Sequence, residues 1–228
     1  MEFEREKLLI EEKINLLKEK TILVLGLGGV GGYVVESLAR SGIGHLILVD
    51  YDIVDITNIN RQIIALHSTI GKKKTECFKK RISDINPNCI VDTYDIFYSE
   101  ENKDIIFSNH LDYIIDCCDS LESKKILIME AYKRNVPIIS CMGTGNKFHP
   151  ELFKIAKLKK TEYDPLSKKL RFLLKDNKEL LETMVLYSTE TPVPFKGKIG
   201  SISYVPSVAG LMLTSYVING FLEENKEK

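Results

Sequence analysis

A glycine-rich loop between an apolar strand and a helix constrains the fold of this chain most. Residues 21–26 form a continuous apolar run, which is typical of a strand buried on both faces of a parallel sheet. Residues 30–40 are predicted to form a helix, and Gly42 follows them as a stop signal. The loop between the two contains the pattern G-x-G-x-x-G, formed by Gly26, Gly28 and Gly31. A strand, a tight turn and a helix in this order predict the first βα unit of an open sheet.

The rest of the chain continues this rhythm as far as residue 142. Strands are predicted at 45–50, 90–94, 113–117 and 137–142, and helical stretches at 72–85, 102–107 and 123–135. Strands that alternate with helices indicate an α/β protein with a doubly wound, mostly parallel, Rossmann-like sheet. The rhythm then breaks, and a C-terminal α+β elaboration is predicted from segments 153–158, 166–174 and 184–189 and a final helix from about residue 207.

The 228 residues are expected to form one globular unit with three parts. An N-terminal helix occupies 1–20, with helical spacing of apolar residues over 8–17, a nucleotide-binding domain occupies 21–145, and the elaboration occupies 146–228. Because the net charge is zero, a polyanionic partner would have to meet a local basic patch.

The glycine loop and one acidic residue together predict a nucleotide site. Glycines such as Gly26, Gly28, Gly29 and Gly31 let backbone N–H groups approach phosphate oxygens, and the helix that follows adds a partial positive charge. Asp50 stands nineteen residues beyond Gly31, at the end of the second strand, where a carboxylate accepts hydrogen bonds from ribose hydroxyls. The alternative is that the glycines only allow close packing of strand and helix. Taken alone, the loop would favour a dinucleotide.

Polar residues beyond the second strand shift the prediction to ATP. Arg61, together with Lys74 near a helix start, would neutralise a triphosphate, and Asp119 at the end of a strand would hold Mg²⁺ through ATP. Each has a simpler interpretation, since Asn58 and Asn60 form turns readily, Lys74 would be solvated and Asp119 would cap the next helix. Their occurrence together favours the adenylation of a carboxylate. The loop after strand two contributes Asp52, Asp55, Asn58, Asn60, Arg61 and Gln62.

Several segments of the chain together resemble the ubiquitin-activating-enzyme-like adenylation superfamily, to which sulfur-carrier activating enzymes belong. These segments are GLGGVGGYVVESLARSGIG, VDYDIVDITNINRQ, GKKK and DCCDS. Others are similar to its tRNA threonylcarbamoyladenosine dehydratase branch, namely FER, RISDINPNC, MGTGNKFHP, KTEYDPLSKKLRFLLK and LYSTETP. The resemblance covers nearly the whole chain and implies an ATP-dependent enzyme that is a homodimer.

The resemblance also implies roles for single residues. Asp50 would bind ribose, and Asn58, Arg61 and Lys74 would surround the phosphates. Asp119 would organise Mg²⁺ or the attacking carboxylate, so the catalytic residues would be Arg61, Lys74 and Asp119. Arg5 matches an arginine that reaches the nucleotide across a dimer interface, although this chain lacks the glycine usual near Ile10 and Glu11. His149 stands where many relatives have Asp, and we assign it no catalytic role.

The cysteine pattern argues against the zinc site and the acceptor cysteine that are common in the superfamily. Sulfur-carrier activating enzymes commonly carry two C-x-x-C pairs for zinc and often a later cysteine that accepts the acyl group. This chain has five cysteines, no C-x-x-C and none after Cys141, which predicts no zinc site. Cys117 and Cys118 lie on a predicted strand, which favours a structural role. We therefore expect the acyl group to pass directly to a nucleophile on the substrate, as in a ring closure.

The substrate follows from the resemblance. It implies a tRNA that decodes ANN codons, in which the carboxylate of threonylcarbamoyladenosine beside the anticodon is adenylated and then cyclised with loss of water. Residues 154–178 contain nine Lys or Arg against three acids, with interleaved aromatic residues, which is either an RNA footprint or a solvated helix face. In the first case Lys168, Lys169 and Arg171 would contact phosphates while Leu170, Leu173 and Leu174 pack inward.

Two other functions are open on the sequence alone. One is adenylation of the C-terminal glycine of a ubiquitin-like sulfur carrier, and the other is a non-catalytic nucleotide-binding or NAD-responsive module. A sulfur-transfer protein is a further possible partner. No secretory signal is evident, and the apolar stretch 208–222 is shorter than the ~20 residues of a membrane span, so we expect a cytoplasmic protein without a membrane partner.

Overall fold

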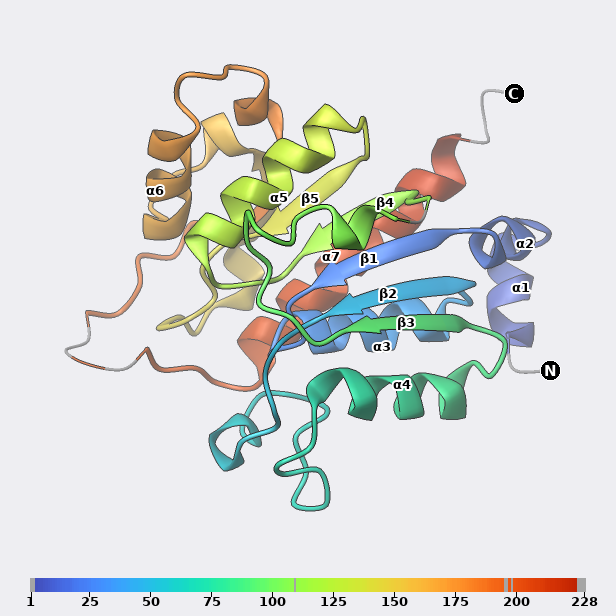
Figure 1. The fold of residues 1–228 in the computed structure, drawn as a ribbon. Helices are drawn as coiled ribbons and strands as arrows, with labels where there is room; N and C mark the ends of the chain where they lie inside the picture. Colours follow the sequence, from blue (N-terminus) through green and yellow to red (C-terminus); the bar gives the residue numbers. More distant parts are fainter. Residues whose placement is uncertain (1–2, 109, 195–196, 198, 225–228) are drawn as a thin grey trace.

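The computed structural model describes residues 3–108, 110–194, 197 and 199–224. Within these residues, seven strands form a single sheet in the order β3-β2-β1-β4-β5-β7-β6, in which only the β6–β7 pair is antiparallel. This arrangement confirms the predicted α/β fold with a mostly parallel sheet (Figure 1). The strands are β1 (Thr21–Leu25), β2 (His45–Val49), β3 (Ile90–Tyr94), β4 (Tyr113–Asp116), β5 (Ile138–Cys141), β6 (Phe153–Lys157) and β7 (Met184–Ser188).

Helices cover both faces of the sheet (Figure 1). They are α1 (Glu4–Ile10), α2 (Lys13–Lys18), α3 (Gly31–Arg40), α4 (Lys74–Ile85), α5 (Leu121–Lys133), α6 (Pro165–Leu173) and α7 (Tyr204–Glu224), with 3₁₀ turns at Ile56–Asn58, Ile105–Phe107, Pro150–Leu152, Leu158–Lys160 and Leu180–Glu182. The helix expected over 102–107 is therefore only a 3₁₀ turn, and the single N-terminal helix expected over 8–17 is two short helices. Glu11, with a φ of 53°, separates them.

The continuous apolar run of β1 explains the two-layer core. Alternate side chains of a strand point to opposite faces, so Ile22 and Val24 join the core under α3, α4 and α7, whereas Leu23 and Leu25 join the core under α5. All four are buried. A third apolar cluster lies between α5, α6 and β7 and makes the C-terminal elaboration continuous with the rest of the molecule.

Helix α7 is longer than the apolar stretch 208–222 that the sequence analysis singled out. By length and composition alone, its segment Tyr204–Glu223 could cross a membrane, and 44% of an apolar stretch of 18 residues within it is buried inside the structure. One face packs on α3 so closely that a Cβ at Gly210 would lie 2.5 Å from the carbonyl oxygen of Val30. The buried side chains of this face, Val205, Ala209, Leu213, Val217 and Phe221, belong to the main core.

Candidate active site

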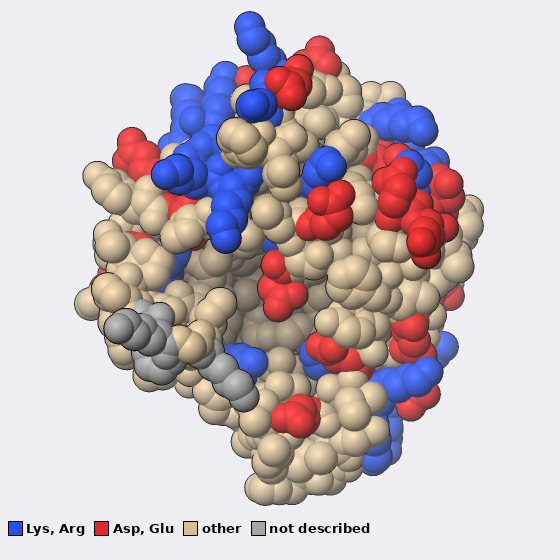
Figure 2. Space-filling model, turned by 60° about the vertical axis from the view of Figure 1, so that its left-hand side comes forward, with Lys and Arg blue, Asp and Glu red and all other residues tan. Residues whose placement is uncertain are grey.

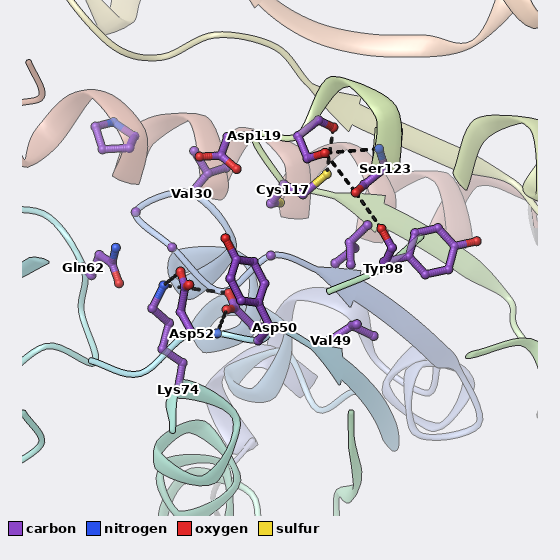
Figure 3. A pocket seen from close by; sticks show the side chains of 18 of the residues that line it. Val30, Val49, Asp50, Asp52, Gln62, Lys74, Tyr98, Cys117, Asp119 and Ser123 are labelled. Carbon is purple, nitrogen blue, oxygen red and sulfur yellow. Dashed lines mark hydrogen bonds and ion pairs between the residues drawn. The ribbon is translucent and has the colours of Figure 1, made fainter. Parts of the chain in front are cut away.

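A cavity of about 310 Å³ opens where β1, β2 and β4 end at the same edge of the sheet (Figure 3). This is the edge at which open α/β sheets bind ligands. Gly31 and Arg5 are absent from its described lining, although both were predicted to bind nucleotide. The predicted site residues that do line it are Gly26, Gly28, Gly29, Asp50, Asp52, Asn58, Arg61, Lys74 and Asp119.

The glycines of the loop have two different structural roles. Gly26 has a φ of +87°, and a Cβ there would lie 2.8 Å from the backbone nitrogen of Cys118. A Cβ at Gly31 would lie only 1.8 Å from the carbonyl oxygen of Gly26. By contrast, the nearest atom to a Cβ at Gly28 is Nε2 of Gln62, at 3.8 Å. Gly26 and Gly31 therefore permit close packing, while Gly28 leaves the cavity open.

This difference predicts opposite outcomes for two alanine variants. Gly31→Ala should lower the free energy of unfolding by about 3 kcal/mol, because the backbone of the loop must move to remove the clash. Gly28→Ala should change the free energy of unfolding by less than about 1 kcal/mol while weakening nucleotide binding. Urea unfolding and calorimetric titration with ATP measure the two effects. Equal stability of both variants would contradict this assignment.

Two carboxylates and one lysine form the floor of the cavity (Figure 3). The Asp50 carboxylate accepts hydrogen bonds from the backbone N–H of Leu27, at 2.6 Å, and of Asp52, at 2.8 Å. Lys74 Nζ lies 2.7 Å from Asp52 Oδ2 and 3.9 Å from Asp50 Oδ2. Because a carboxylate has about four lone-pair sites, Asp50 keeps acceptors for two further hydroxyl donors.

Burial affects the charged side chains at the floor of the cavity. Lys74 is only 3% exposed, so the interpretation of Lys74 as a solvated lysine is wrong. Burial raises the pKa of the Asp50 carboxyl, and the attraction of Lys74 opposes the rise. The lysine is held by an antiparallel bridge between Ile53 and Lys73, which joins the loop to the start of α4. Lys74 therefore enters the cavity as a fixed charge.

A short 3₁₀ turn presents the polar segment after β2. Asp55 and Asn58 form a capping box in which the Asp55 side chain accepts from the turn and Asn58 Oδ1 accepts from the Asp55 N–H. Asn58 is thus a turn-forming residue as well as a cavity residue. Arg61 donates from Nη1 to the carbonyl oxygen of Thr57 and to Asn60 Oδ1, both at 2.9 Å. These bonds orient a guanidinium that keeps further N–H donors for an anionic ligand.

Asp119 lies across the cavity from Asp50 and Lys74 (Figure 3). It is exposed and forms no hydrogen bond or ion pair with the residues that the structure describes. Ser120, not Asp119, is the N-cap of α5, and its side chain accepts from the N–H of Ser123. The capping interpretation of Asp119 is therefore wrong, and its carboxylate is available to a ligand.

A buried ion pair fixes the loop that carries Asp119. Asp116 Oδ1 accepts from the backbone N–H of Cys118, at 3.1 Å, and Asp116 Oδ2 lies 3.0 Å from Lys124 Nζ. Ser140 donates to the same Oδ2 at 2.5 Å, and all three polar side chains are fully buried. Burial also raises the pKa of Cys117 and Cys118 well above the ordinary value of a thiol. Both thiols are therefore protonated at neutral pH, which supports their structural role.

Some cavity residues were missed because they come from other parts of the chain. Thr144 lies in the loop after β5, and Ser201 and Pro206 belong to the C-terminal elaboration, yet all three line the cavity. Gln62, predicted as one of the polar residues of the loop after strand two but given no role toward a ligand, is 7% exposed, and its Oε1 has no hydrogen-bond partner in the described part of the structure. A buried acceptor without a donor is costly, so Gln62 is poised to receive one from a ligand. Its position directly after Arg61 is the sequence feature that could have identified Gln62 as a site residue.

Two further residues lie away from the cavity. Arg5 is on α1, beside the edge at which the strands begin, opposite the cavity (Figure 1). His149 is exposed, and its Nδ1 lies 2.8 Å from Glu151 Oε1. That hydrogen bond raises the pKa of His149. Neither side chain reaches the cavity of its own chain.

The predicted basic segment forms a surface beside the cavity. Lysine and arginine side chains gather above a hollow (Figure 2), and exposed ones near α6 are Lys160, Lys168, Lys169, Lys175 and Lys178. Leu170 and Leu174 pack inward as expected, but Leu173 is 39% exposed. Arg171 donates from Nη1 to the carbonyl oxygen of Thr161 at 2.9 Å, so part of its guanidinium is used in a hydrogen bond within the protein.

Comparisons with known proteins agree with this geometry. The sequence profile of the ThiF family matches residues 5–228. A Bacillus subtilis tRNA threonylcarbamoyladenosine dehydratase is 40% identical, and the match covers 98% of this chain and 95% of that one. The Haemophilus influenzae protein of the same name is 42% identical over 74% of this chain and 65% of its own length.

A solved structure also matches over the whole chain. It is the Escherichia coli tRNA N6-threonylcarbamoyladenosine dehydratase in complex with ATP, which is 33% identical, with a TM-score of 0.94 over 100% of this chain and 96% of that one. These matches confirm the family that the motifs indicated. The chain therefore belongs to the ThiF family, and within it to the group of the tRNA threonylcarbamoyladenosine dehydratases.

Proposed function

We propose that this protein is an ATP-dependent tRNA-modifying enzyme that adenylates and then cyclises threonylcarbamoyladenosine. The observation that carries the proposal is a cavity at the nucleotide edge of the sheet that joins Asp50, Lys74, Arg61 and Asp119. Support comes from a relative of this fold that binds ATP and from relatives named for this dehydration over nearly the full chain.

The residues divide into binding and reaction roles. Asp50 accepts the ribose hydroxyls, and the N–H groups of the glycine loop face the phosphates. Arg61 and Lys74, with Asn58 beside them, stabilise the negative charge that develops on the α-phosphate and the leaving pyrophosphate. Asp119 faces them from the opposite wall and helps to orient the attacking carboxylate. The chemistry therefore depends on position and charge rather than on a protein nucleophile.

Mg²⁺ fits this site only together with ATP. Asp119 supplies one carboxylate that is free of the protein's own ion pairs, and Mg²⁺ commonly takes one or two carboxylates plus phosphate oxygens. When bound, the ion would offset phosphate charge. The sequence-based prediction of no zinc site stays a prediction.

The reaction balances as a dehydration driven by ATP. A carboxylate oxygen of the substrate attacks the α-phosphorus, an acyl–phosphate bond forms, and the bond to pyrophosphate breaks. The neighbouring carbamoyl group then attacks the activated acyl carbon, the ring closes and AMP leaves. The net change in the nucleoside is the loss of one water.

The basic surface around α6 supports an RNA partner. Its exposed lysines would attract a phosphate backbone without reading its sequence, so tRNA affinity should fall with rising salt. The tRNA would decode ANN codons and present its modified adenosine beside the anticodon. The protein is cytoplasmic in this proposal, acts without a membrane, and has a sulfur-transfer protein as a further candidate partner.

We also propose a homodimer, in which Arg5 would reach the nucleotide of the partner subunit. Leu8 and Leu9, on the same helix as Arg5, are 83% and 84% exposed. Exposed leucines side by side are explained if the helix is covered in an assembly. Light scattering and the effect of Arg5→Ala on ATP affinity would test both statements.

One experiment separates this proposal from activation of a sulfur carrier. The protein is incubated with ATP, Mg²⁺ and tRNA that carries the open modification, and the nucleosides are analysed by mass spectrometry. We expect a product lighter by one water, and no product without ATP or with excess EDTA. Pyrophosphate exchange that requires a carrier protein, without any such nucleoside product, would favour the alternative.

A further inference from the structure

A second cavity, of about 510 Å³, adjoins the nucleotide cavity. Arg61, Cys117, Asp119 and Thr144 line both, so the two cavities share a wall that carries a cation and a free carboxylate. The second cavity is also lined by the loop after β5 and by the elaboration, with apolar contributions from Met142 in that loop and from Leu166 and Ile199 in the elaboration. A ligand here would lie beside the nucleotide cavity, next to the shared wall.

A buried ion pair builds the wall between the loop after β5 and α6. Lys147 Nζ donates to the carbonyl oxygen of Gly143, at 2.6 Å, and to Asp164 Oδ2, at 3.0 Å. Asp164 is also the N-cap of α6, because its Oδ1 accepts from the N–H and hydroxyl groups of Ser167. Both charged side chains are buried, with exposures of 1% and 0%. The pair therefore ties α6 rigidly to the cavity, and the charge of Lys147 is already neutralised.

Lys169 supplies a second, unneutralised positive charge. It lines the cavity from α6, is exposed, and forms no hydrogen bond or ion pair with the described residues. The second cavity thus has Arg61 at the wall shared with the nucleotide and Lys169 on α6. Apolar side chains also line it. A ligand that matches this pattern is anionic at two separate points and has an apolar body.

We propose that the second cavity binds the modified nucleotide itself, extruded from its RNA strand. The carboxylate lies at the shared wall beside Arg61 and Asp119, the base lies among the apolar side chains, and a backbone phosphate lies on Lys169. An enzyme that acts on a base commonly takes it out of the stack in this manner. The inference rests on the proposed function, and it adds Lys169 as a substrate-binding residue.

Steady-state kinetics with ATP and a modified anticodon stem-loop test the assignment. Lys169→Ala should raise the KM for the stem-loop about tenfold, because a charge-assisted hydrogen bond to phosphate is lost, and should change the KM for ATP less than twofold. Lys169→Arg should restore most of the affinity. Lys133→Ala, which removes a lysine from the far end of α5, is the control and should leave both KM values within twofold.

A second variant tests the cavity independently of charge. Leu166→Trp would occupy the space assigned to the base, and should lower kcat/KM for the stem-loop at least tenfold while ATP binding persists. Equal stem-loop KM values for Lys169→Ala and Lys133→Ala, with full turnover by Leu166→Trp, would overturn this inference alone. Absence of any turnover by the wild-type protein would overturn the proposed function and this inference with it.

Discussion

Asp119→Asn should lower the rate of pyrophosphate release by about 100-fold or more, with ATP still bound. Asp50 and Asp52 also line the nucleotide cavity, but both lie near Lys74, whereas Asp119 has no ion-pair partner among the described residues. Its negative charge is therefore free to organise the cation or the attacking carboxylate. The change retains size and hydrogen bonding, so the lost rate would report the lost charge.

Stability measurements make this result specific. Because Asp119 is exposed and does not cap α5, Asp119→Asn should change the free energy of unfolding by less than about 0.5 kcal/mol. Glu122→Gln, which neutralises an exposed acid in the first turn of α5, is the matched control and should keep its activity. A fully active Asp119→Asn protein would remove Asp119 from the catalytic residues.

Local sequence was sufficient for the sheet and for the core of the site. The glycine loop and Asp50 are parts of one βα unit and the strand that follows, so their geometry depends on near neighbours and could be predicted. Lys74 was predicted to bind phosphate, but its burial was not, because that burial depends on the bridge between Ile53 and Lys73. Contacts between distant segments carry no signal in a single sequence.

The same reason explains the residues that were missed. Ser201 reaches the cavity only because the elaboration folds back over the end of the sheet, and Thr144 lies in the loop after β5, far in the sequence from the glycine loop. The second cavity is built by Lys147 and Asp164, two charged residues that a sequence pattern assigns to the surface. The helix expected at 102–107 does not form, because a segment of six residues is too short to nucleate a helix without tertiary support. Long periodic segments were predictable, whereas paired buried charges were not.

The largest effect on stability is expected from Lys124→Met. Lys124 is fully buried, and burial by itself lowers its pKa, but the charge and hydrogen bond of Asp116, together with the neighbouring Cys118 and Cys141, raise the pKa of Lys124 above its ordinary value. Removal of the lysine leaves Asp116 as an uncompensated buried charge, which should cost about 3–5 kcal/mol. For a chain of this size the melting temperature should fall by about 10 °C. Thermal unfolding followed by circular dichroism measures the change.

The neighbouring lysine provides the control. Lys125 pairs at 3.3 Å with Glu122 on the exposed side of α5, so Lys125→Met should cost less than about 1 kcal/mol. The double variant Asp116→Asn/Lys124→Met should be more stable than Lys124→Met alone, because asparagine keeps an acceptor for the Cys118 N–H without a buried charge. If the double variant were no more stable, loss of packing around Lys124, rather than the unpaired carboxylate, would be the cause. Since Cys118 precedes Asp119, recovery of activity in the double variant would also show that the pair acts by holding this loop in place.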